Sequence, residues 1–312
     1  MAAALAKFRA EEVEERVFAA GGIATAVRAL EVWQAHRQGQ ALAAAPLISH
    51  RRTGDSSPRP RSPADLPKAG VRVLDLARVI AGPVCTRFLG ALGAEVLRLD
   101  PPNRPDMQSG VVTDSLLGKR SSFVNLDSRE GVATLHCLLA RADEVVCSHS
   151  GPWAGRRGFD SVVQAPTGIA MGESATGREP GALPCQLLDH ATGYLAAALA
   201  GIRRQSLQGG NHVKRLSLAR TASWLTSQGT QSQEGAGAFA AEPDSPAWLV
   251  ELDSARGLVT VEQPLTRSIV AGRACSRSGG SRCAFGYLAA SVRPAGSTAS
   301  CPSRRGAHVG AA

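Results

Sequence analysis

The sequence predicts an α/β protein built on an open, mostly parallel sheet with flanking helices. Residues 71–100 carry the main signal: a short β-branched run, apolar residues at helical spacing, and a second short apolar run. Two strands joined by one helix lie parallel in the same sheet, so this pattern predicts a βαβ unit. A helical pattern at 131–141 followed by a strand pattern at 143–147 repeats the alternation.

The segments before this unit differ from it in composition. Residues 1–50 are expected to be a helical N-terminal segment, with a helix over 22–40 whose apolar side chains recur at helical spacing. Residues 51–69 are rich in Arg, Pro and Ser, which predicts a linker or an extended strap. We therefore place a domain boundary near residue 69 and expect the α/β domain to occupy residues 70–230.

Within the βαβ unit, the turn between strand and helix carries Gly82 and Pro83. Pro83 has the fixed φ that suits the first turn of a helix, and Gly93 is well placed to end that helix. The turn lacks the three glycines of G-x-G-x-x-G, so it does not support a dinucleotide site. On pattern alone, a purely structural α/β unit is the commoner interpretation.

The rest of the domain alternates between strand and helix patterns with long loops. Further elements are expected as a strand at 122–126, a helix start at 127–130, a helix at 162–171, a helix after Pro184, a strand at 213–218 and a helix from 219. Residues 231–312 lack a sustained period and carry no acidic residue after Glu262, which predicts a mostly irregular or disordered tail.

The net charge of +9 does not indicate a nucleic-acid partner, because it comes mainly from the tail. Residues 263–312 contain seven arginines and no acidic residue, and without them the basic excess falls to two. The longest apolar run, 194–202, is too short to span a bilayer, and the first residues lack a secretory signal. The seven cysteines form no C-x-x-C pair, so neither zinc nor a disulfide framework is expected, and a reducing cytoplasm is the default location.

Asp189 is the strongest candidate for chemistry. It lies near the start of the helix that follows Pro184, where backbone N–H groups and the helix dipole are expected to hold a carboxylate ionised. An acidic residue at this position is most often a cap or a first-turn charge. The functional alternative is a nucleophile that attacks an activated acyl carbon. His190 is its neighbour in sequence, but adjacent side chains diverge on a helix.

Other candidates are weaker. Arg156 and Arg157 lie among glycines and could grip a phosphate, although solvated loop charges are the commoner outcome. Lys119 follows Gly118, but the first glycine and the final Ser/Thr of a phosphate-binding P-loop are missing. Cys85 and Cys185 have no histidine at a telling position, and a buried structural thiol is the usual fate of such residues.

Four blocks of the sequence together resemble the class III coenzyme A transferases, the CaiB–BaiF group. The blocks are VRVLDLARVIAGPVCTRFLGALGAEVLRLDPP, GKRSSFVNLDSREG, GPWAGRRGFDSVVQAPTGIA and LPCQLLDHATGYLAAALAGI. They occur in the family's order between about residues 70 and 226, and it is this order that makes the resemblance specific. Residues 1–50 are similar to the region that precedes this unit in longer, two-unit members.

The resemblance implies an activity and a site. It implies transfer of CoA from an acyl-CoA thioester to a carboxylic acid, with Asp189 as the nucleophile, through a mixed anhydride and then an aspartyl-CoA thioester. It also implies that Val79 and Ile80 line the CoA site, that Arg157 lies near CoA, and that two chains interlock as a homodimer. No metal and no permanently bound cofactor is implied, since acyl-CoA is a substrate.

Two alternatives stay open beside CoA transfer. Between Cys147 and Gly151 the family has a loop, a helix and a strand that this chain lacks, so it could be a truncated and catalytically inactive member. A sister activity of the fold, 2-methylacyl-CoA racemisation, uses a histidine at the position that matches Phe159. Because phenylalanine cannot act as a base, racemisation is disfavoured.

Overall fold

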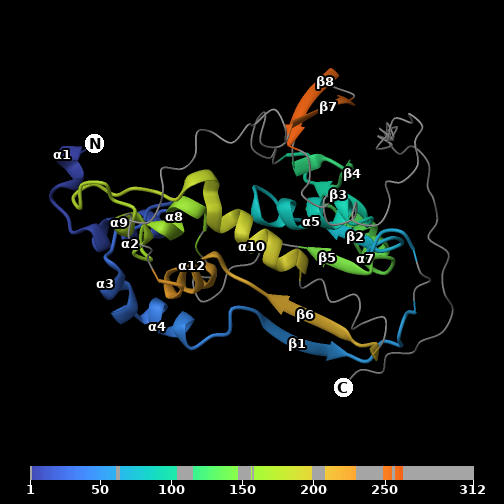
Figure 1. Cartoon of the computed structure of the whole chain (residues 1–312), viewed down its shortest axis with the longest axis horizontal. Coiled ribbons are helices and arrows are strands. Elements are labelled where there is room, and N and C mark those ends of the chain that lie inside the picture. Colours follow the sequence, from blue (N-terminus) through green and yellow to red (C-terminus); the bar gives the residue numbers. More distant parts are fainter. Residues whose placement is uncertain are drawn as a thin grey trace, which may run out of the picture.

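A four-stranded parallel sheet lies at the centre of the α/β region (Figure 1). The computed structural model describes residues 2–60, 64–103, 115–146, 156, 158–198, 208–229, 249–254 and 257–262. The sheet order is β4-β3-β2-β5. Its strands are β2 (Arg72–Asp75), β3 (Glu95–Asp100), β4 (Lys119–Phe123) and β5 (Glu144–Val146). All three pairings are parallel, which confirms the fold class and the βαβ unit expected over 71–100.

Helices α5 and α7 connect these strands in the expected order. Helix α5 (Ala81–Ala91) joins β2 to β3 and contains Pro83 in its first turn. Helix α7 (Arg129–Leu139) joins β4 to β5, and the side chain of Ser128 caps it by accepting the N–H of Gly131 at 3.0 Å. Strand β4 begins at Lys119, three residues before the strand expected at 122–126. Its lysine side chain is completely buried, and its polarity hid the strand from the hydrophobic pattern.

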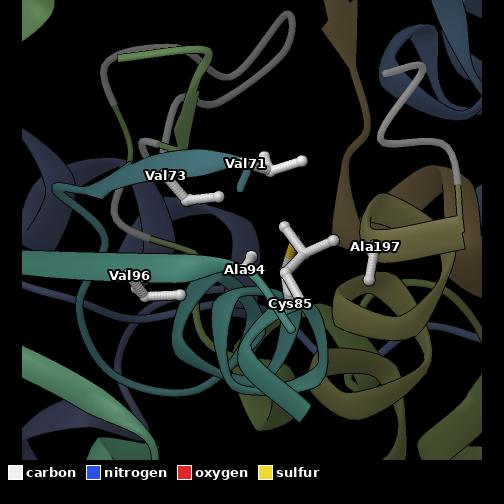
Figure 2. Close-up of a cluster of buried hydrophobic side chains, with 7 residues drawn as sticks. Val71, Val73, Cys85, Ala94, Val96 and Ala197 are labelled. Atoms are coloured by element: carbon white, nitrogen blue, oxygen red, sulfur yellow. The ribbon is translucent and has the colours of Figure 1, made fainter. Parts of the chain in front are cut away.

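Helix α10 (Leu187–Ala198) lies between two hydrophobic clusters. Ala197 belongs to the cluster formed by the sheet and α5, which Figure 2 shows with Val71, Val73, Cys85, Ala94 and Val96. Leu188, at the other end of α10, packs with Val163, Ile169 and Ala222 in the second cluster. The small side chains of α10 let it lie in contact with α5 along most of its length, which fixes its position relative to the sheet.

The N-terminal segment is less helical than the sequence predicted. It forms α1 (Ala2–Leu5), α2 (Ala10–Ala19), α3 (Leu30–Ala35) and α4 (Arg37–Ala43). The helix expected over 22–40 was therefore wrong for its first turns, because residues 22–29 are not helical. In this stretch the N–H of Ala26 donates to the Glu14 carboxylate, and that of Arg28 donates to the carbonyl oxygen of Ala165. These bonds replace the helical ones.

A second sheet joins the N-terminal segment to the far end of the α/β region. Strand β1 (Ser49–Gly54) pairs antiparallel with β6 (Asn211–Arg215), so the segment expected as a linker begins with a strand. Helix α12 (Leu218–Ser227) follows β6 as expected and packs against α10. The side chain of Arg220 on α12 donates to the carbonyl oxygen of Ala45 at 2.8 Å, which also ties α12 to the N-terminal segment.

The helix expected at 162–171 is interrupted. It consists of α8 (Asp160–Gln164) and α9 (Ile169–Gly172), because Pro166 has no N–H to donate and Gly168 has a φ of +86°. A Cβ on Gly168 would lie 2.6 Å from the Cα of Leu30, so the turn also lets α3 approach closely.

Part of the expected tail is ordered as a hairpin. Strands β7 (Leu249–Ser254) and β8 (Gly257–Glu262) pair antiparallel within the region expected to be mostly irregular. Residues 231–248 and 263–312 lie outside the described residues, so the prediction of disorder for them stays a prediction. Among the helices that are described, none has the length and apolar character needed to cross a bilayer.

Candidate active site

Asp189 lies in the first turn of α10, on the face that packs against α5. Gly193 and Ala197 follow it at intervals of four residues, so the three share one face of the helix. A Cβ on Gly193 would lie 2.5 Å from the carbonyl oxygen of Ala81, and Ala197 is buried in the cluster under α5. The Asp189 side chain is only 5% exposed. The sequence prediction of a carboxylate near the start of this helix is confirmed, and the carboxylate is buried.

The turn that precedes α5 belongs to the same site. Val79 has a φ of +70°, and Ile80 is buried and precedes the first residue of α5. Ala81, which follows, touches Gly193 of α10. The structure therefore brings the expected CoA-lining turn and the candidate nucleophile onto two helices that pack directly against each other.

Residues with unusual backbone conformations come just before both α5 and α10. The described part of the chain has three non-glycine residues with positive φ: Val79, Cys185 and Gln186. The first precedes α5, and the other two form the 3₁₀ turn (Pro184–Gln186) that leads into α10. Such conformations cost roughly 1–3 kcal/mol each and are most common at functional sites, so their position supports a site here.

Burial, followed by the negative charge of Asp160, raises the pKa of Asp189 from its ordinary value of 3.8 to about 6. We had expected the helix N-terminus to stabilise this carboxylate, and that expectation was wrong. The N–H groups of Leu188 and Asp189 instead donate to the carboxylate of Asp160, at 2.8 and 3.2 Å. The side chain of Asp189 receives no hydrogen bond from the described residues. It is still mainly ionised at neutral pH, but it is more basic than an exposed aspartate.

Asp160 is the residue that the sequence analysis missed. It begins α8, and its side chain is 1% exposed because it caps a helix that starts 27 residues later in the chain. The sequence signal that could have indicated Asp160 is its place in GFDS, directly after Phe159. A cap supplied by a distant segment leaves no pattern in the helix's own sequence.

Lys119 is part of the support of α5 and does not bind phosphate here. Its ammonium group donates to Asp75 Oδ2 at 2.9 Å, to the carbonyl oxygen of Pro83 at 2.9 Å and to Thr86 Oγ1 at 2.6 Å. Burial lowers its pKa, and the adjacent Asp75 opposes this effect. Asp75 also accepts the N–H of Ala77 and the hydroxyl of Thr86. The network holds both ends of the turn that contains Val79.

Arg156, the first residue of the arginine pair at 156–157, binds acidic side chains and not phosphate. Its guanidinium contacts Glu14 at 2.9 Å and Glu15 at 2.5 Å, and it lies over the ring of Phe18 at 4.6 Å. Arg156 therefore binds α2 through these acidic side chains, and the suggestion that it grips phosphate was wrong. Arg157, the residue expected near CoA, lies outside the described residues.

Other candidate side chains offer no competing chemistry. Cys85 is buried in the core, where burial raises the pKa of its thiol to about 12, in agreement with the structural role expected for it. Across the described residues, no group of three or more His, Cys, Asp or Glu side chains could hold a metal ion. The site therefore consists of one buried carboxylate, its capping partner and a strained turn.

Comparison with known proteins decides the family. A family model described as CoA-transferase family III matches residues 69–150 and 147–248, which together make up more than half of the chain. The chain belongs to CoA-transferase family III. The two matches meet at residues 147–150, where the sequence analysis located the segment that this chain lacks.

Several curated CoA-transferases are similar to the chain. Succinyl-CoA:glutarate CoA-transferase of Mus musculus is 30% identical over 191 residues, which cover 46% of this chain and 44% of that protein. An acyl-CoA transferase of Gibberella moniliformis is 29% identical over 160 residues, which cover 49% of this chain and 28% of that protein. Formyl-CoA:oxalate CoA-transferase of Streptomyces coelicolor is 37% identical over 101 residues, which cover 29% of this chain and 24% of that protein. The chain thus spans less than half the length of each of these family III relatives.

Among solved structures, a CAIB/BAIF family protein from Brucella suis matches with a TM-score of 0.45 and 22% sequence identity. The match covers 62% of this chain and 65% of that one.

Proposed function

We propose that this family III protein transfers coenzyme A from an acyl-CoA thioester to a carboxylic acid, with Asp189 as the nucleophile. The observation that carries the proposal is the state of this carboxylate. It is buried on the α10 face that packs against α5, it lacks hydrogen-bond donors among the described residues, and its pKa of about 6 leaves it ionised at neutral pH. An ionised carboxylate without strong hydrogen bonds is a competent nucleophile toward a thioester.

The proposed reaction proceeds by acyl exchange at one carboxylate. An oxygen of Asp189 attacks the thioester carbonyl carbon, the C–S bond breaks, and a mixed anhydride forms as CoA thiolate leaves. The thiolate then attacks the Asp189 carbonyl carbon, which releases the donor acid and gives an aspartyl-CoA thioester. The acceptor carboxylate attacks this thioester to form a second anhydride, and the thiolate attacks the acceptor's acyl carbon. The products are a new acyl-CoA and free Asp189.

The turn before α5 is the proposed wall of the CoA site. Val79 and Ile80 are proposed to line it. They come directly before Ala81, and Ala81 lies against Gly193, which is one turn after Asp189 on α10. The Asp75–Lys119 network holds this turn in a conformation that valine seldom adopts. Arg157 is proposed to lie near CoA, and the protein is proposed to act as a homodimer in the cytoplasm. The only reactants required are acyl-CoA and a carboxylic acid acceptor.

Trapping with hydroxylamine tests the proposal. Hydroxylamine attacks an aspartyl anhydride or thioester and converts the side chain to a stable hydroxamate, which peptide mass spectrometry locates. The full-length protein, incubated with a panel of acyl-CoA thioesters, should carry the hydroxamate at Asp189 only when acyl-CoA is present. The variant Asp189→Asn should carry none, and Asp127→Asn, which alters an exposed carboxylate before α7, should behave as wild type.

A catalytically inactive, truncated family member is the alternative that the segment missing after Cys147 favours. No hydroxamate with any thioester of the panel would establish this alternative and end the transferase proposal. The third candidate, 2-methylacyl-CoA racemase, lacks a base at Phe159. If it were correct, incubation of a 2-methylacyl-CoA in deuterium oxide would place deuterium at its C2 carbon.

A further inference from the structure

The carboxylate of Asp160 is tied to the start of α10 on one side and to α8 on the other. Its Oδ2 accepts the N–H groups of Leu188 and Asp189, and its Oδ1 accepts the side-chain amide of Gln164. The carbonyl oxygen of that amide accepts the N–H of Leu183 at 2.7 Å. All of these groups are buried or partly buried, so the position of Asp160 relative to α10 is closely determined.

We propose that Asp160 is a positioning residue for the nucleophile: it fixes the first turn of α10, and its negative charge makes the neighbouring Asp189 carboxylate a stronger nucleophile. The inference rests on the proposed function, because only a nucleophilic Asp189 has a reactivity to adjust. It goes beyond that function by assigning a role to a residue that itself contacts no reactant.

The cap and the charge act in the same direction. A helix N-terminus normally stabilises a nearby anion through its free N–H groups. Here Asp160 accepts two of those N–H groups, so they cannot stabilise Asp189. A carboxylate whose negative charge is poorly stabilised loses less stabilisation energy when it attacks a carbonyl carbon, so it reacts more readily. The raised pKa of Asp189 agrees with this arrangement.

The other charged or titratable groups near α10 do not account for the effect. Within the described residues, Asp160 is the charged group that raises the pKa of Asp189, after burial itself. Asp75 and Lys119 form an ion pair with each other behind the first turn of α5. The remaining groups lie on the elements packed against α10 or on α10 itself: Cys85 and Arg87 on α5, Arg220 on α12, Cys185 in the preceding turn, and His190 and Tyr194 on α10.

A direct titration of Asp189 tests the charge effect without depending on catalysis. The full chain is labelled with ¹³C at the aspartate side-chain carboxyl groups, and the Asp189 signal is assigned by its loss in Asp189→Asn. In wild type its midpoint should lie at about 6. In Asp160→Asn, whose amide oxygen can still cap the helix, the midpoint should fall by roughly 0.5–1 unit, with burial keeping it above 3.8. An unchanged midpoint would overturn the inference.

A matched control separates charge from packing. Thr192 lies on another face of α10, and its hydroxyl forms a hydrogen bond with that of Thr221 at 2.8 Å. The variant Thr192→Val disturbs the helix packing without changing charge, so its Asp189 midpoint should equal that of wild type. A shift in this variant as large as that in Asp160→Asn would show that packing, not charge, sets the midpoint, and the inference would fail.

The trapping reaction then connects the titration to function. In Asp160→Asn, hydroxamate formation at neutral pH should be slower than in wild type, and the acid limb of its pH profile should move to lower pH. If wild type forms no hydroxamate, the proposed function fails, whereas the titration still decides whether Asp160 acts on Asp189. If the midpoint moves but the rate and the acid limb do not, the positioning role is refuted. If neither Asp160→Asn nor Asp160→Ser folds by circular dichroism, Asp160 is a structural cap only and the inference is withdrawn.

Discussion

Gly193 of α10 lies directly against the carbonyl oxygen of Ala81 at the start of α5. A Cβ at position 193 would approach that oxygen to 2.5 Å and the Cβ of Val84 to 2.9 Å. Both obstacles belong to the first turn of α5, and one of them is backbone, so neither can move cheaply. Asp189 lies one helical turn earlier on the same face of α10, so this contact sets the spacing between the helix that carries the carboxylate and the start of α5.

Replacing Gly193 by alanine should therefore separate the two helices. We expect Gly193→Ala to lower the free energy of unfolding by about 1–3 kcal/mol, the usual cost of overpacking, and to slow hydroxamate formation at Asp189. Urea denaturation measures the first effect and trapping the second. Gly172→Ala is the matched control, because Gly172 is also helical but has open space around its Cβ position. An equal response of the two variants would contradict the assigned contact.

Lys119 should be far more important for stability than its neighbour Arg120. Lys119→Met leaves the Asp75 carboxylate buried without its cation, and breaking such a pair from one side typically costs about 3–5 kcal/mol. Arg120→Met removes only an exposed, loosely paired charge and should change the free energy of unfolding by less than about 0.5–1 kcal/mol. Denaturant unfolding of both variants checks this prediction. Similar losses in the two would mean that the buried network does not support the turn before α5.

The same network shows where sequence reasoning succeeded and where it did not. The apolar, β-branched pattern predicted β2, α5 and β3 because their side chains face one core, and it placed Asp189 near the start of a helix. It could not predict that Lys119 lies in a strand, because a buried lysine looks like a surface residue until its partner is known. The partner, Asp75, is 44 residues away and becomes adjacent only through the sheet.

Asp160 and the N-terminal helix break were missed for a related reason. The cap on α10 comes from another segment, so neither the helix nor its flanks record it. The residues before Leu30 have a helical apolar period, but the N–H of Ala26 donates to the buried Glu14 carboxylate, and this segment is not helical. Both are tertiary hydrogen bonds between distant residues, and periodicity describes only local ones.

Replacing the proposed nucleophile should stabilise the protein. The pKa of Asp189 is raised to about 6 in the folded state, so folding favours its neutral form. The contribution of this one side chain to stability is therefore greatest below pH 4, and it is lost as the pH rises through 6. Because two pKa units correspond to about 2–3 kcal/mol, Asp189→Asn should be more stable than wild type by up to that amount at pH 7.5 and by little at pH 4. Urea unfolding at both pH values measures the difference.

The control for this prediction is Asp127→Asn, which removes an exposed carboxylate and should show no such dependence on pH. If Asp189→Asn proved less stable than wild type at pH 7.5, the carboxylate would have a stabilising partner, and the view of an unsatisfied anion at this position would be incorrect.

Glu14 should show the opposite dependence on pH. Burial alone would raise its pKa, but the N–H of Ala26 and the charges of Arg28 and Arg156 outweigh burial and lower it below 4.5. A lowered pKa means that the ionised form stabilises the folded state above pH 4.5, and that this stabilisation is lost as the pH falls through the lowered value. Glu14→Gln should cost about 1.5–3 kcal/mol at pH 7, because hydrogen bonds to a charged group are lost beside the buried Arg28.

The cost of Glu14→Gln should shrink as the pH falls below 4.5, since the wild-type carboxylate then becomes neutral as well. Glu15→Gln, on the exposed neighbour that shares Arg156, should cost less than about 1 kcal/mol at either pH. Urea unfolding followed by circular dichroism at pH 7 and pH 3.5 checks both variants. A cost for Glu14→Gln that stays constant between these pH values would show that the ionised form contributes no more to stability than the neutral one.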